Sequence, residues 1–412
     1  MSDRQSWRTS KMALCSEARF LIRKIQDLRC LTSRRHRVKE KWAASRPKHP
    51  PTSLAANHFD VTYSSQLGKL WPSVRVALLS ERKYGALLNN FCDDAFVGDL
   101  TSQGCRDFVT ERDRKEHVCM ERDPEVKFSE QSDSTSVEKH DMNGQQQFSA
   151  PHVSTNIKCF VFPRGDISRF KPARPDISGL LGYYLMDAAS VLPCLALDVH
   201  EGQTLLDLCA APGGKTLALL QTHAIGFLCL NDSSVSRTLR LRKVLHSYIP
   251  KQLLTSETLR ITSFDGTKWG EAEQNTFDRV LVDVPCTTDR HSLMEDENNI
   301  FSKSRTSERR RLPQLQLQLL LAGVVAARPG GEIVYSTCTL SHIQNVGVVE
   351  QAIHSAREDH GIQLEVVDLR PLTNMFRNTF HFASDLHLGE MVIPHLAANF
   401  GPIYMCKLRR LT

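Results

Sequence analysis

Short apolar runs alternate with longer amphipathic stretches along residues 156–412. The runs have the length of buried strands, and the amphipathic stretches have the spacing of helices that cover a sheet. This alternation predicts an α/β fold with a doubly wound parallel sheet. The expected strands are Leu205–Cys209, Gly226–Leu230, Leu259–Phe264, Arg279–Val282 and Glu332–Ser336, with Leu364–Leu369 and Ile403–Lys407 closing the sheet at one edge.

Three helices are expected between these strands. Thr216–Gln221 follows a glycine-rich turn. A second helix should face the sheet with its apolar side chains, which are Val235, Leu239, Leu245 and either Tyr248 or Ile249. The third helix, around Leu315–Ala327, should stop at the segment Pro-Gly-Gly of residues 329–331, because these residue types end helices.

The preceding part of the chain predicts a small helical region over residues 46–110, packed on the larger domain. From Pro72 onward its apolar residues recur at three- to four-residue spacing, as in a helix. They are Val74, Ala77, Leu78, Tyr84 and Leu88. Residues 111–155 are polar, with few aromatic side chains and mixed charge, which is typical of a flexible surface insert.

The first 45 residues form a basic arm that predicts a mitochondrial transit peptide. Residues 1–50 carry 14 Lys/Arg against 4 Asp/Glu. Apolar residues at near-helical spacing alternate with arginines, as import signals require. The alternative is a surface helix that contacts RNA or a partner. The rest of the chain has 38 basic and 42 acidic groups, so its net charge does not indicate RNA binding.

Length and composition exclude several classes of protein. A chain of 412 residues with 41% hydrophobic and 24% charged residues is neither wholly disordered nor a coiled-coil rod or disulfide miniprotein. No apolar run approaches the ~18 residues of a membrane span. The 12 cysteines include no C-x-x-C pair and no cluster with zinc-ligand spacing, so we expect reduced thiols and no metal site.

The segment LDLCAAPGGK, residues 206–215, indicates a nucleoside site. It ends a strand, lets the backbone approach a ligand at Gly213 and Gly214, and begins a helix. It matches neither a P-loop nor G-x-G-x-x-G. Asp232 ends the next strand, where its carboxylate can accept hydrogen bonds from a ribose. Asp265 and Gly266 follow the third strand, where the Asp265 carboxylate could reach the exocyclic amine of an adenine. The alternative is a structural turn with two solvent-facing carboxylates.

Two thiols follow consecutive core strands, Cys286 in DVPC and Cys338 in YSTC. If the strands are neighbours, about 4.8 Å apart, both thiols face the nucleoside site. A thiolate that adds to C6 of a cytosine makes C5 nucleophilic enough to accept a methyl group. Asp283 could hydrogen-bond N3 or the 4-amino group of the base. Arg290 and His291, which are nearby in sequence, are candidates to supply the local positive field that a thiolate requires. The alternative is core packing of both cysteines.

At these residues the chain resembles the Sun-domain family of RNA cytosine-5 methyltransferases, which use S-adenosylmethionine. The motifs are LCAAPGGK, LNDSS, TSFDG, LVDVPC and VYSTC, and the similarity covers residues 156–412. The resemblance implies a Rossmann-like class I methyltransferase domain. It also implies that Cys338 is the nucleophile and that Cys286 assists product release. The implied cofactor contacts are Gly213, Gly214, Lys215, Asp232, Arg237, Asp265, Gly266 and Asp283.

Within the family the chain is most similar to the mitochondrial member that methylates small-subunit ribosomal RNA, as in RGDISRFKPARP and ANFGPIYMCKLRRL. This implies location in the mitochondrial matrix and a role in ribosome assembly, with ribosomal RNA and the precursors of both ribosomal subunits as partners. It also implies a heterodimer with a helical-repeat protein of the mitochondrial transcription termination factor family.

One motif departs from the family. Where its members usually have Glu-Asn-Glu, this chain has Gln344, Asn345 and Val346. The loss of both acids keeps open a ribosome-assembly scaffold in which catalysis is secondary. A transfer-RNA or DNA cytosine methyltransferase is the other alternative.

Overall fold

The computed structural model describes residues 49–93, 95–111, 153–384 and 386–412. The predicted transit peptide and all but a few residues of the predicted insert lie outside the described residues. Pro51–Thr412 form one compact unit, separate from Met1–Pro50.

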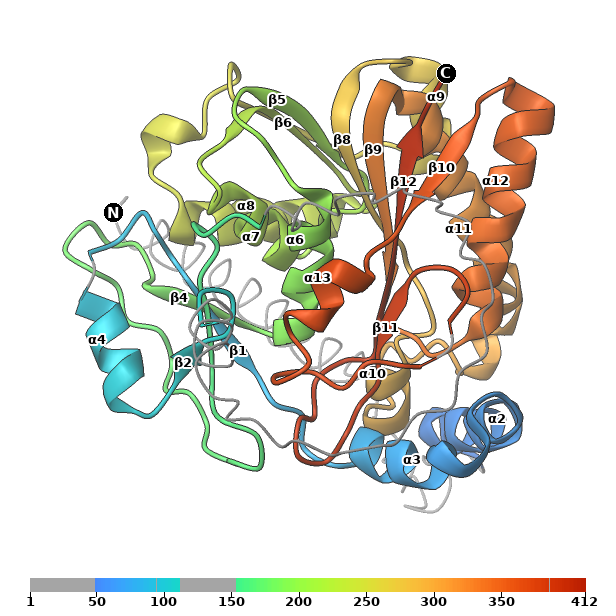
Figure 1. Ribbon diagram of the computed structural model, residues 1–412, viewed down its shortest axis with the longest axis horizontal. Coiled ribbons are helices and arrows are strands. Elements are labelled where there is room, and N and C mark those ends of the chain that lie inside the picture. Colours follow the sequence, from blue (N-terminus) through green and yellow to red (C-terminus); the bar gives the residue numbers. More distant parts are fainter. Residues whose placement is uncertain (1–48, 94, 112–152, 385) are drawn as a thin grey trace, which may run out of the picture. The chain divides into compact units, whose positions relative to one another are not determined.

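The centre of this unit is the predicted sheet, with strands in the order β10-β12-β9-β8-β5-β6-β7 and β11 paired with β12 (Figure 1). Strands β7, β6, β5, β8 and β9 are parallel, while β12 runs antiparallel to β9 and β10 at one edge, as predicted. The bounds are β5 Gln203–Asp207, β6 Ile225–Asn231, β7 Leu259–Thr262, β8 Phe277–Asp283, β9 Ala327–Thr337, β10 Leu364–Val367, β11 Glu390–Val392 and β12 Ile403–Arg410.

Helices cover both faces of the sheet. Alternate residues of each strand belong to two separate apolar cores: in β5, Leu205 packs into one and Leu206 into the other. The first core includes α6 (Leu192–Leu197), α7 (Gly214–Leu220) and α8 (Val235–Tyr248), and the second includes α9 (Trp269–Ala272), α11 (Thr306–Ala326) and α12 (Val346–His360). Both strand faces are buried, which explains the uninterrupted apolar runs.

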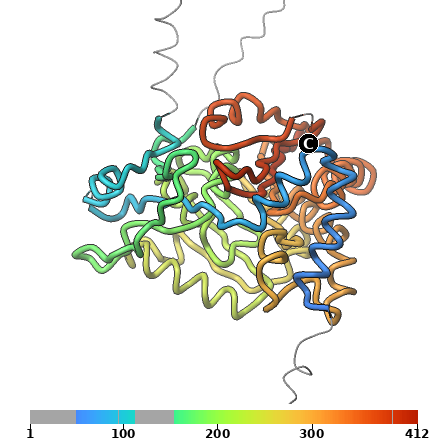
Figure 2. Tube along the Cα trace, turned by 90° about the horizontal axis from the view of Figure 1, so that it is seen from below, coloured from blue at the N-terminus to red at the C-terminus, as the bar shows by residue number. Residues whose placement is uncertain are grey.

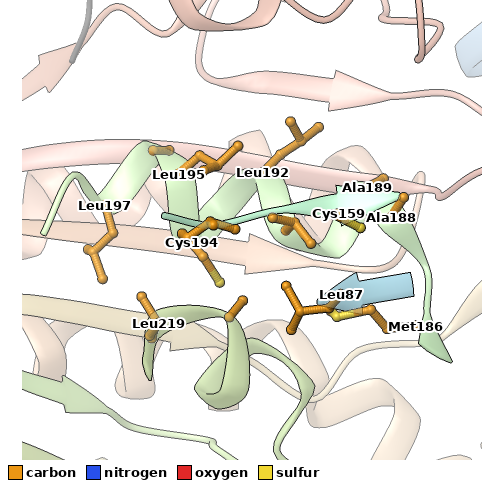
Figure 3. Packing of buried hydrophobic residues seen from close by; sticks show 14 of the residues in the cluster. Leu87, Cys159, Met186, Ala188, Ala189, Leu192, Cys194, Leu195, Leu197 and Leu219 are labelled. Carbon is orange, nitrogen blue, oxygen red and sulfur yellow. The ribbon is translucent and has the colours of Figure 1, made fainter. Parts of the chain in front are cut away.

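Helix α6 lies within the first core, with all six residues buried. Figure 3 shows Leu192 and Leu195 on one side of this helix and Cys194 on the other, toward Leu219 of α7. The Cys194 thiol lies 3.5 Å from the Lys215 carbonyl, which fixes α7 against it. This packing positions the glycine-rich turn that precedes α7.

Two helix predictions need correction. In α8, Val235 and Leu239 are 63% and 55% exposed, because the buried face is made by Thr238, Leu241, Leu245 and Tyr248. Helix α11 starts at Thr306, well before Leu315, and accommodates Pro313. It does end before Pro329, but residues 329–331 belong to β9 rather than to a loop.

A second sheet of four strands has the order β2-β3-β1-β4. Its strands are β1 Gly85–Leu88, β2 Arg106–Asp107, β3 Cys159–Val161 and β4 Tyr183–Met186. The predicted helical run over Tyr84 and Leu88 is therefore wrong, because α3 (Trp71–Leu79) ends before it. All four residues of β1 are buried, and a short run without polar residues does not distinguish a strand from a helix. The same region also contains helices α2 (Pro51–Leu67) and α4 (Ala95–Ser102), so it combines helices with strands β1 and β2, and α13 (Arg370–Asn374) follows β10.

The N-terminal helices pack on α10 (Asp289–Met294), the short helix that follows the DVPC motif. The Tyr63 hydroxyl of α2 donates to Asp289 at 2.8 Å. The buried Arg290 guanidinium donates to the carbonyl oxygens of Ala77 at 3.1 Å and Gly401 at 3.1 Å. Figure 2 shows α2 and α3, in blue, beside the orange part of the chain. These hydrogen bonds connect α2, the end of α3 and the C-terminal segment at Gly401 to α10.

Candidate active site

The candidate site lies where the strand order reverses. From β5 the chain continues to β6 and β7 on one side, and then to β8 and β9 on the other. The gap between the carboxyl ends of β5 and β8 is where ligands bind in such sheets. A cavity of about 290 Å³ lies there, with walls from the turn after β5, from Asp283 at the end of β8 and from Tyr184–Asp187. We call it the cofactor cavity.

The glycine-rich turn has the backbone conformation that the sequence predicts. Gly213 has φ +117°, and a Cβ atom there would lie 2.8 Å from the side chain of Leu241. Gly213 therefore lets the turn pack against α8, while Gly214 and Lys215 line the cofactor cavity. Gly266 also serves packing, because a Cβ atom there would lie 2.7 Å from Leu319.

Asp232 and Arg237 lie together at the end of β6. The Asp232 side chain is 2% exposed, accepts a hydrogen bond from the Ser234 amide at 3.0 Å, and lies 3.2 Å from Arg237. The Arg237 contact is an ion pair between its Nη1 atom and Asp232 Oδ2, which accepts no hydrogen bond of good geometry within the described part of the chain. Arg237 also donates to the Ala211 carbonyl of the glycine-rich turn. A buried carboxylate oxygen that still lacks a well-aligned donor suits a ligand hydroxyl.

Asn231, which the sequence analysis missed, joins three strand ends. Its amide donates to the carbonyl oxygens of Leu208 at 3.2 Å and Phe264 at 3.0 Å, and its oxygen accepts from the Phe264 amide at 3.0 Å. Asp265 follows directly, but its carboxylate accepts from the Thr267 amide and hydroxyl at 3.1 and 2.8 Å. Asp232, Arg237, Asp265 and Gly266 are not among the residues that line the cofactor cavity.

Asp207 is a second residue that the sequence analysis missed. It ends β5, lines the cofactor cavity and accepts a hydrogen bond from the Thr216 hydroxyl at 2.8 Å. Burial raises its pKa to about 7. Its Oδ1 atom has no hydrogen-bond donor among the residues that the structure describes. A carboxyl in an otherwise apolar strand was the feature that could have identified it.

The two predicted cysteines lie face to face. Their Sγ atoms are 3.2 Å apart, and the Cys338 amide nitrogen lies 3.4 Å from Cys286 Sγ. The hydrogen bond from Cys338 lowers the pKa of Cys286, whereas the same bond, together with burial, raises the pKa of Cys338. Cys286 is thus the more acidic of the two thiols. Pairing of β8 with β9 brings the two loops together.

Cys338 lines a cavity of about 570 Å³ with Lys215 and Asp283, and we call it the catalytic cavity. Lys215 Nζ lies 2.8 Å from Asp283 Oδ2, and the Ser336 hydroxyl donates to Asp283 Oδ1 at 2.7 Å. Burial lowers the pKa of Lys215, but the charge and the hydrogen bond of the Asp283 carboxylate raise it, so the pKa is raised overall. Lys215 and Asp283 line the cofactor cavity as well, so one ion pair belongs to both cavities.

Arg290 and His291 line the catalytic cavity, but their polar atoms are engaged elsewhere. The Arg290 guanidinium donates to backbone carbonyls and to Asn399 Oδ1, and His291 Nε2 lies 3.1 Å from the Glu297 carbonyl. The positive charge that lowers the pKa of Cys338 is that of Lys215, against the larger effects of Cys286, burial and Asp283. The expected source of the positive field therefore needs correction.

The residues that replace the family's usual acids form a buried polar network. Gln344 accepts from the Thr287 amide at 3.2 Å and from Gln316 at 3.0 Å, and donates to the Thr287 hydroxyl at 3.1 Å. Asn345 accepts from the Thr337 hydroxyl at 2.6 Å. Val346 is buried in the second core. The amide group of Gln344 thus connects the two cysteine loops without adding a charge.

The described residues contain no group of three or more His, Cys, Asp or Glu side chains arranged to hold a metal ion. The same residues contain no helix long and apolar enough to cross a membrane.

Comparison with known proteins identifies close relatives. A family model described as 16S rRNA methyltransferase RsmB/F matches residues 194–409. The chain is 51% identical to the 5-cytosine rRNA methyltransferase NSUN4 of Xenopus laevis over 401 residues, covering 95% of this chain and 98% of that protein. It is 33% identical to the mitochondrial tRNA (cytosine(34)-C(5))-methyltransferase of Mus musculus over 360 residues, covering 87% of this chain and 90% of that protein.

Solved structures confirm the predicted Rossmann-like fold. A methyltransferase homologue from Pyrococcus horikoshii has a TM-score of 0.55 and 19% identity, covering 89% of this chain and all (100%) of that chain. NSun6 from Pyrococcus horikoshii with SFG has a TM-score of 0.53 and 15% identity, covering 89% of this chain and 98% of that chain.

We predict that Asp207→Asn changes the pH dependence of stability. The Asp207 carboxyl has a folded-state pKa of about 7, above its ordinary 3.8, so the folded chain binds the additional proton between these values. Wild-type stability should therefore fall as pH rises from about 4 to 7. Between pH 5 and pH 8 the melting temperature of Asp207→Asn should fall less than that of the wild type. Asp359→Asn, on an exposed face of α12, is the control, and a parallel decline in Asp207→Asn would contradict the prediction.

Proposed function

Because the chain belongs to the RsmB/F family of S-adenosylmethionine-dependent RNA cytosine-5 methyltransferases, we propose that it methylates C5 of a cytosine in mitochondrial small-subunit ribosomal RNA and thereby supports ribosome assembly. The observation that carries this proposal is the pair of thiols 3.2 Å apart, beside a cavity that shares the Lys215–Asp283 ion pair with the cofactor cavity. An intact catalytic pair favours catalysis over a scaffold alone.

The residues around the cofactor cavity suit S-adenosylmethionine. Asp232 Oδ2 is buried, accepts no well-aligned hydrogen bond from the described residues, and would accept one from the ribose. The turn at Gly213–Lys215 would hold the methionine part, and Asp265 with Gly266 would lie near the adenine. Arg237 holds Asp232 in place. When bound, S-adenosylmethionine supplies an electrophilic methyl group.

The cysteine pair can carry the chemistry in two stages. First, Cys338 loses its proton to solvent and its sulfur bonds to C6 of cytosine, so that C5 can take the methyl group. The deprotonated Cys286 then removes the C5 proton, and the bond between Cys338 and C6 breaks. Asp283, which is paired with Lys215, accepts a hydrogen bond from the 4-amino group. The net result is one methyl gained and one proton released.

Ribosomal RNA is favoured over transfer RNA by similarity, since the ribosomal RNA methyltransferase is 51% identical and the transfer RNA enzyme 33%. The basic arm supports mitochondrial import, and we assign residues 1–45 as transit peptide and 156–412 as the methyltransferase domain, preceded by the helical region 46–110 and the insert 111–155. Beyond residue 50, acidic groups outnumber basic ones, 42 to 38. We therefore also propose a helical-repeat partner of the mitochondrial transcription termination factor family that contributes RNA affinity in the matrix.

We predict that loss of this protein removes one 5-methylcytosine from mitochondrial small-subunit ribosomal RNA. Bisulfite sequencing of mitochondrial RNA, with and without the protein, measures this directly. Restoration by the wild type but not by Cys338→Ala would show that catalysis is responsible. Loss of a mark on transfer RNA alone would contradict the proposed substrate.

We predict that Asp232→Ala weakens S-adenosylmethionine binding roughly tenfold to hundredfold without unfolding the chain. The reason is the loss of a charge-assisted hydrogen bond, about 1.5–3 kcal/mol. Isothermal calorimetry measures the affinity, and a melting curve verifies the fold. Asp359→Ala is the control on the exposed face of α12. Unchanged affinity in Asp232→Ala would place the cofactor elsewhere.

We predict opposite outcomes for the two cysteines. Cys338→Ala should abolish both methylation and covalent adduct, because no sulfur remains to attack C6. Cys286→Ala should allow attack but slow elimination, leaving protein joined to RNA. A denaturing gel of each variant with RNA and S-adenosylmethionine distinguishes them, with Cys92→Ala as the control. A trapped band from Cys338→Ala and none from Cys286→Ala would reverse the assignment.

A further inference from the structure

One short segment separates three cavities. Arg82 and Tyr84, in the loop between α3 and β1, line the catalytic cavity, the cofactor cavity and a third cavity of about 550 Å³. The opposite wall of the third cavity is Gly165–Phe170. We call it the flanking cavity. Its size falls in the range of pockets that bind small ligands.

Arg82 and Tyr84 form a stacked pair. The Arg82 guanidinium carbon lies 4.5 Å from the centre of the Tyr84 ring, and its Nε atom donates to the Tyr84 hydroxyl at 2.8 Å. The other Arg82 nitrogens donate no hydrogen bond within the described part of the chain, and Tyr84 is 36% exposed. The boundary between the cavities therefore carries the Arg82 guanidinium already stacked on the Tyr84 ring, with hydrogen-bond donors of Arg82 still available.

The flanking cavity is moderately basic. Among its lining residues, Glu81 pairs with Arg169 at 2.6 Å, and Asp166 accepts from the Ser168 amide at 2.7 Å. Arg82 and Lys83 add two positive charges on the facing wall. The adjoining residues 163–178 contain four basic and two acidic side chains. This charge suits a ligand that carries phosphate.

The reaction itself requires such a site. Cys338 lies in the catalytic cavity, so a cytosine can reach it only after leaving its stack. The neighbouring base then loses a stacking partner, and the phosphate between the two nucleotides is drawn toward the cavity boundary. Aromatic rings and guanidinium planes are the groups on which proteins stack unpaired bases.

We propose that the flanking cavity is the subsite for the nucleotide next to the target cytidine in single-stranded RNA. The Arg82–Tyr84 pair stacks the neighbouring base, and the free nitrogens of Arg82 bind the phosphate that links it to the target. This inference rests on RNA cytosine methylation by the family and not on which RNA is the natural substrate.

The test uses fluorescent five-nucleotide RNAs with a central cytidine and the full chain at low salt, where phosphate contacts are strongest. Anisotropy gives the dissociation constant for the intact RNA and for RNAs that lack the base on the 5′ or the 3′ side. Removing the base that occupies the subsite should weaken binding roughly five- to a hundredfold, and removing the other should have a smaller effect.

Variants locate the effect. Tyr84→Ala should weaken binding of the intact RNA but show no further loss with the abasic RNA, because the stacking partner is already gone. Tyr84→Phe keeps the ring and should keep the abasic penalty. Arg82→Ala should reduce the salt dependence by about one phosphate contact. Arg174→Ala removes an equal charge nearby, outside the cavity walls, and should leave the abasic penalty intact.

Three results would overturn the proposal. The first is equal binding of intact and abasic RNAs by the wild type, and the second is no binding of the intact RNA at low salt. The third is that Tyr84→Ala and Arg82→Ala both still bind the abasic RNA more weakly than the intact RNA, by the same factor as the wild type, while calorimetry shows that only their affinity for S-adenosylmethionine is reduced. Because the probes carry no ribosomal sequence, these results are independent of the mapping experiment on ribosomal RNA.

Discussion

The shape of the catalytic cavity depends on the buried guanidinium of Arg290. Its nitrogens reach the end of α3 through the Ala77 and Ser80 carbonyls, and the C-terminal segment through Asn399 and Gly401. Several carbonyl dipoles offset the cost of burying this charge. Burial lowers the pKa of Arg290, and the Asp187 carboxylate opposes that effect. The loop that carries Arg82 and Tyr84 begins at Ser80, so one side chain holds the catalytic loop, this loop and the C-terminal segment together.

The sheet and the cysteine pair could be predicted because local pattern determines them. Buried parallel strands are continuous apolar runs, and their carboxyl ends meet at one edge. Cys286 and Cys338 each follow such a strand, and pairing of β8 with β9 brings them together. The turn at Gly213 was also predictable, but the sequence indicated approach to a ligand there, whereas its positive φ and its contact with Leu241 show that Gly213 packs against α8.

The remaining features depend on contacts between distant residues. Asn231 connects the ends of β5, β6 and β7 through carbonyls that no sequence pattern marks. The buried strand β1 has no polar residue to set a period, so Leu88 was assigned to a helix. Arg290 was expected to supply a positive field for the thiols because it lies four residues after Cys286, whereas its hydrogen-bond partners are more than a hundred residues away along the chain. Sequence proximity was a poor guide to the direction of a long side chain.

The ion pair between Lys215 and Asp283 would link a donor bound in the cofactor cavity electrostatically to the thiols. It lines both cavities, and its two charges act on Cys338 in opposite directions, with Asp283 raising the pKa and Lys215 lowering it. A methyl donor of the sulfonium class brings one additional positive charge to this wall, and its demethylated product brings none. Positive charge favours a thiolate. The cysteine pair should therefore be more easily deprotonated when the donor is present than after transfer, which couples activation of the nucleophile to the presence of a methyl group.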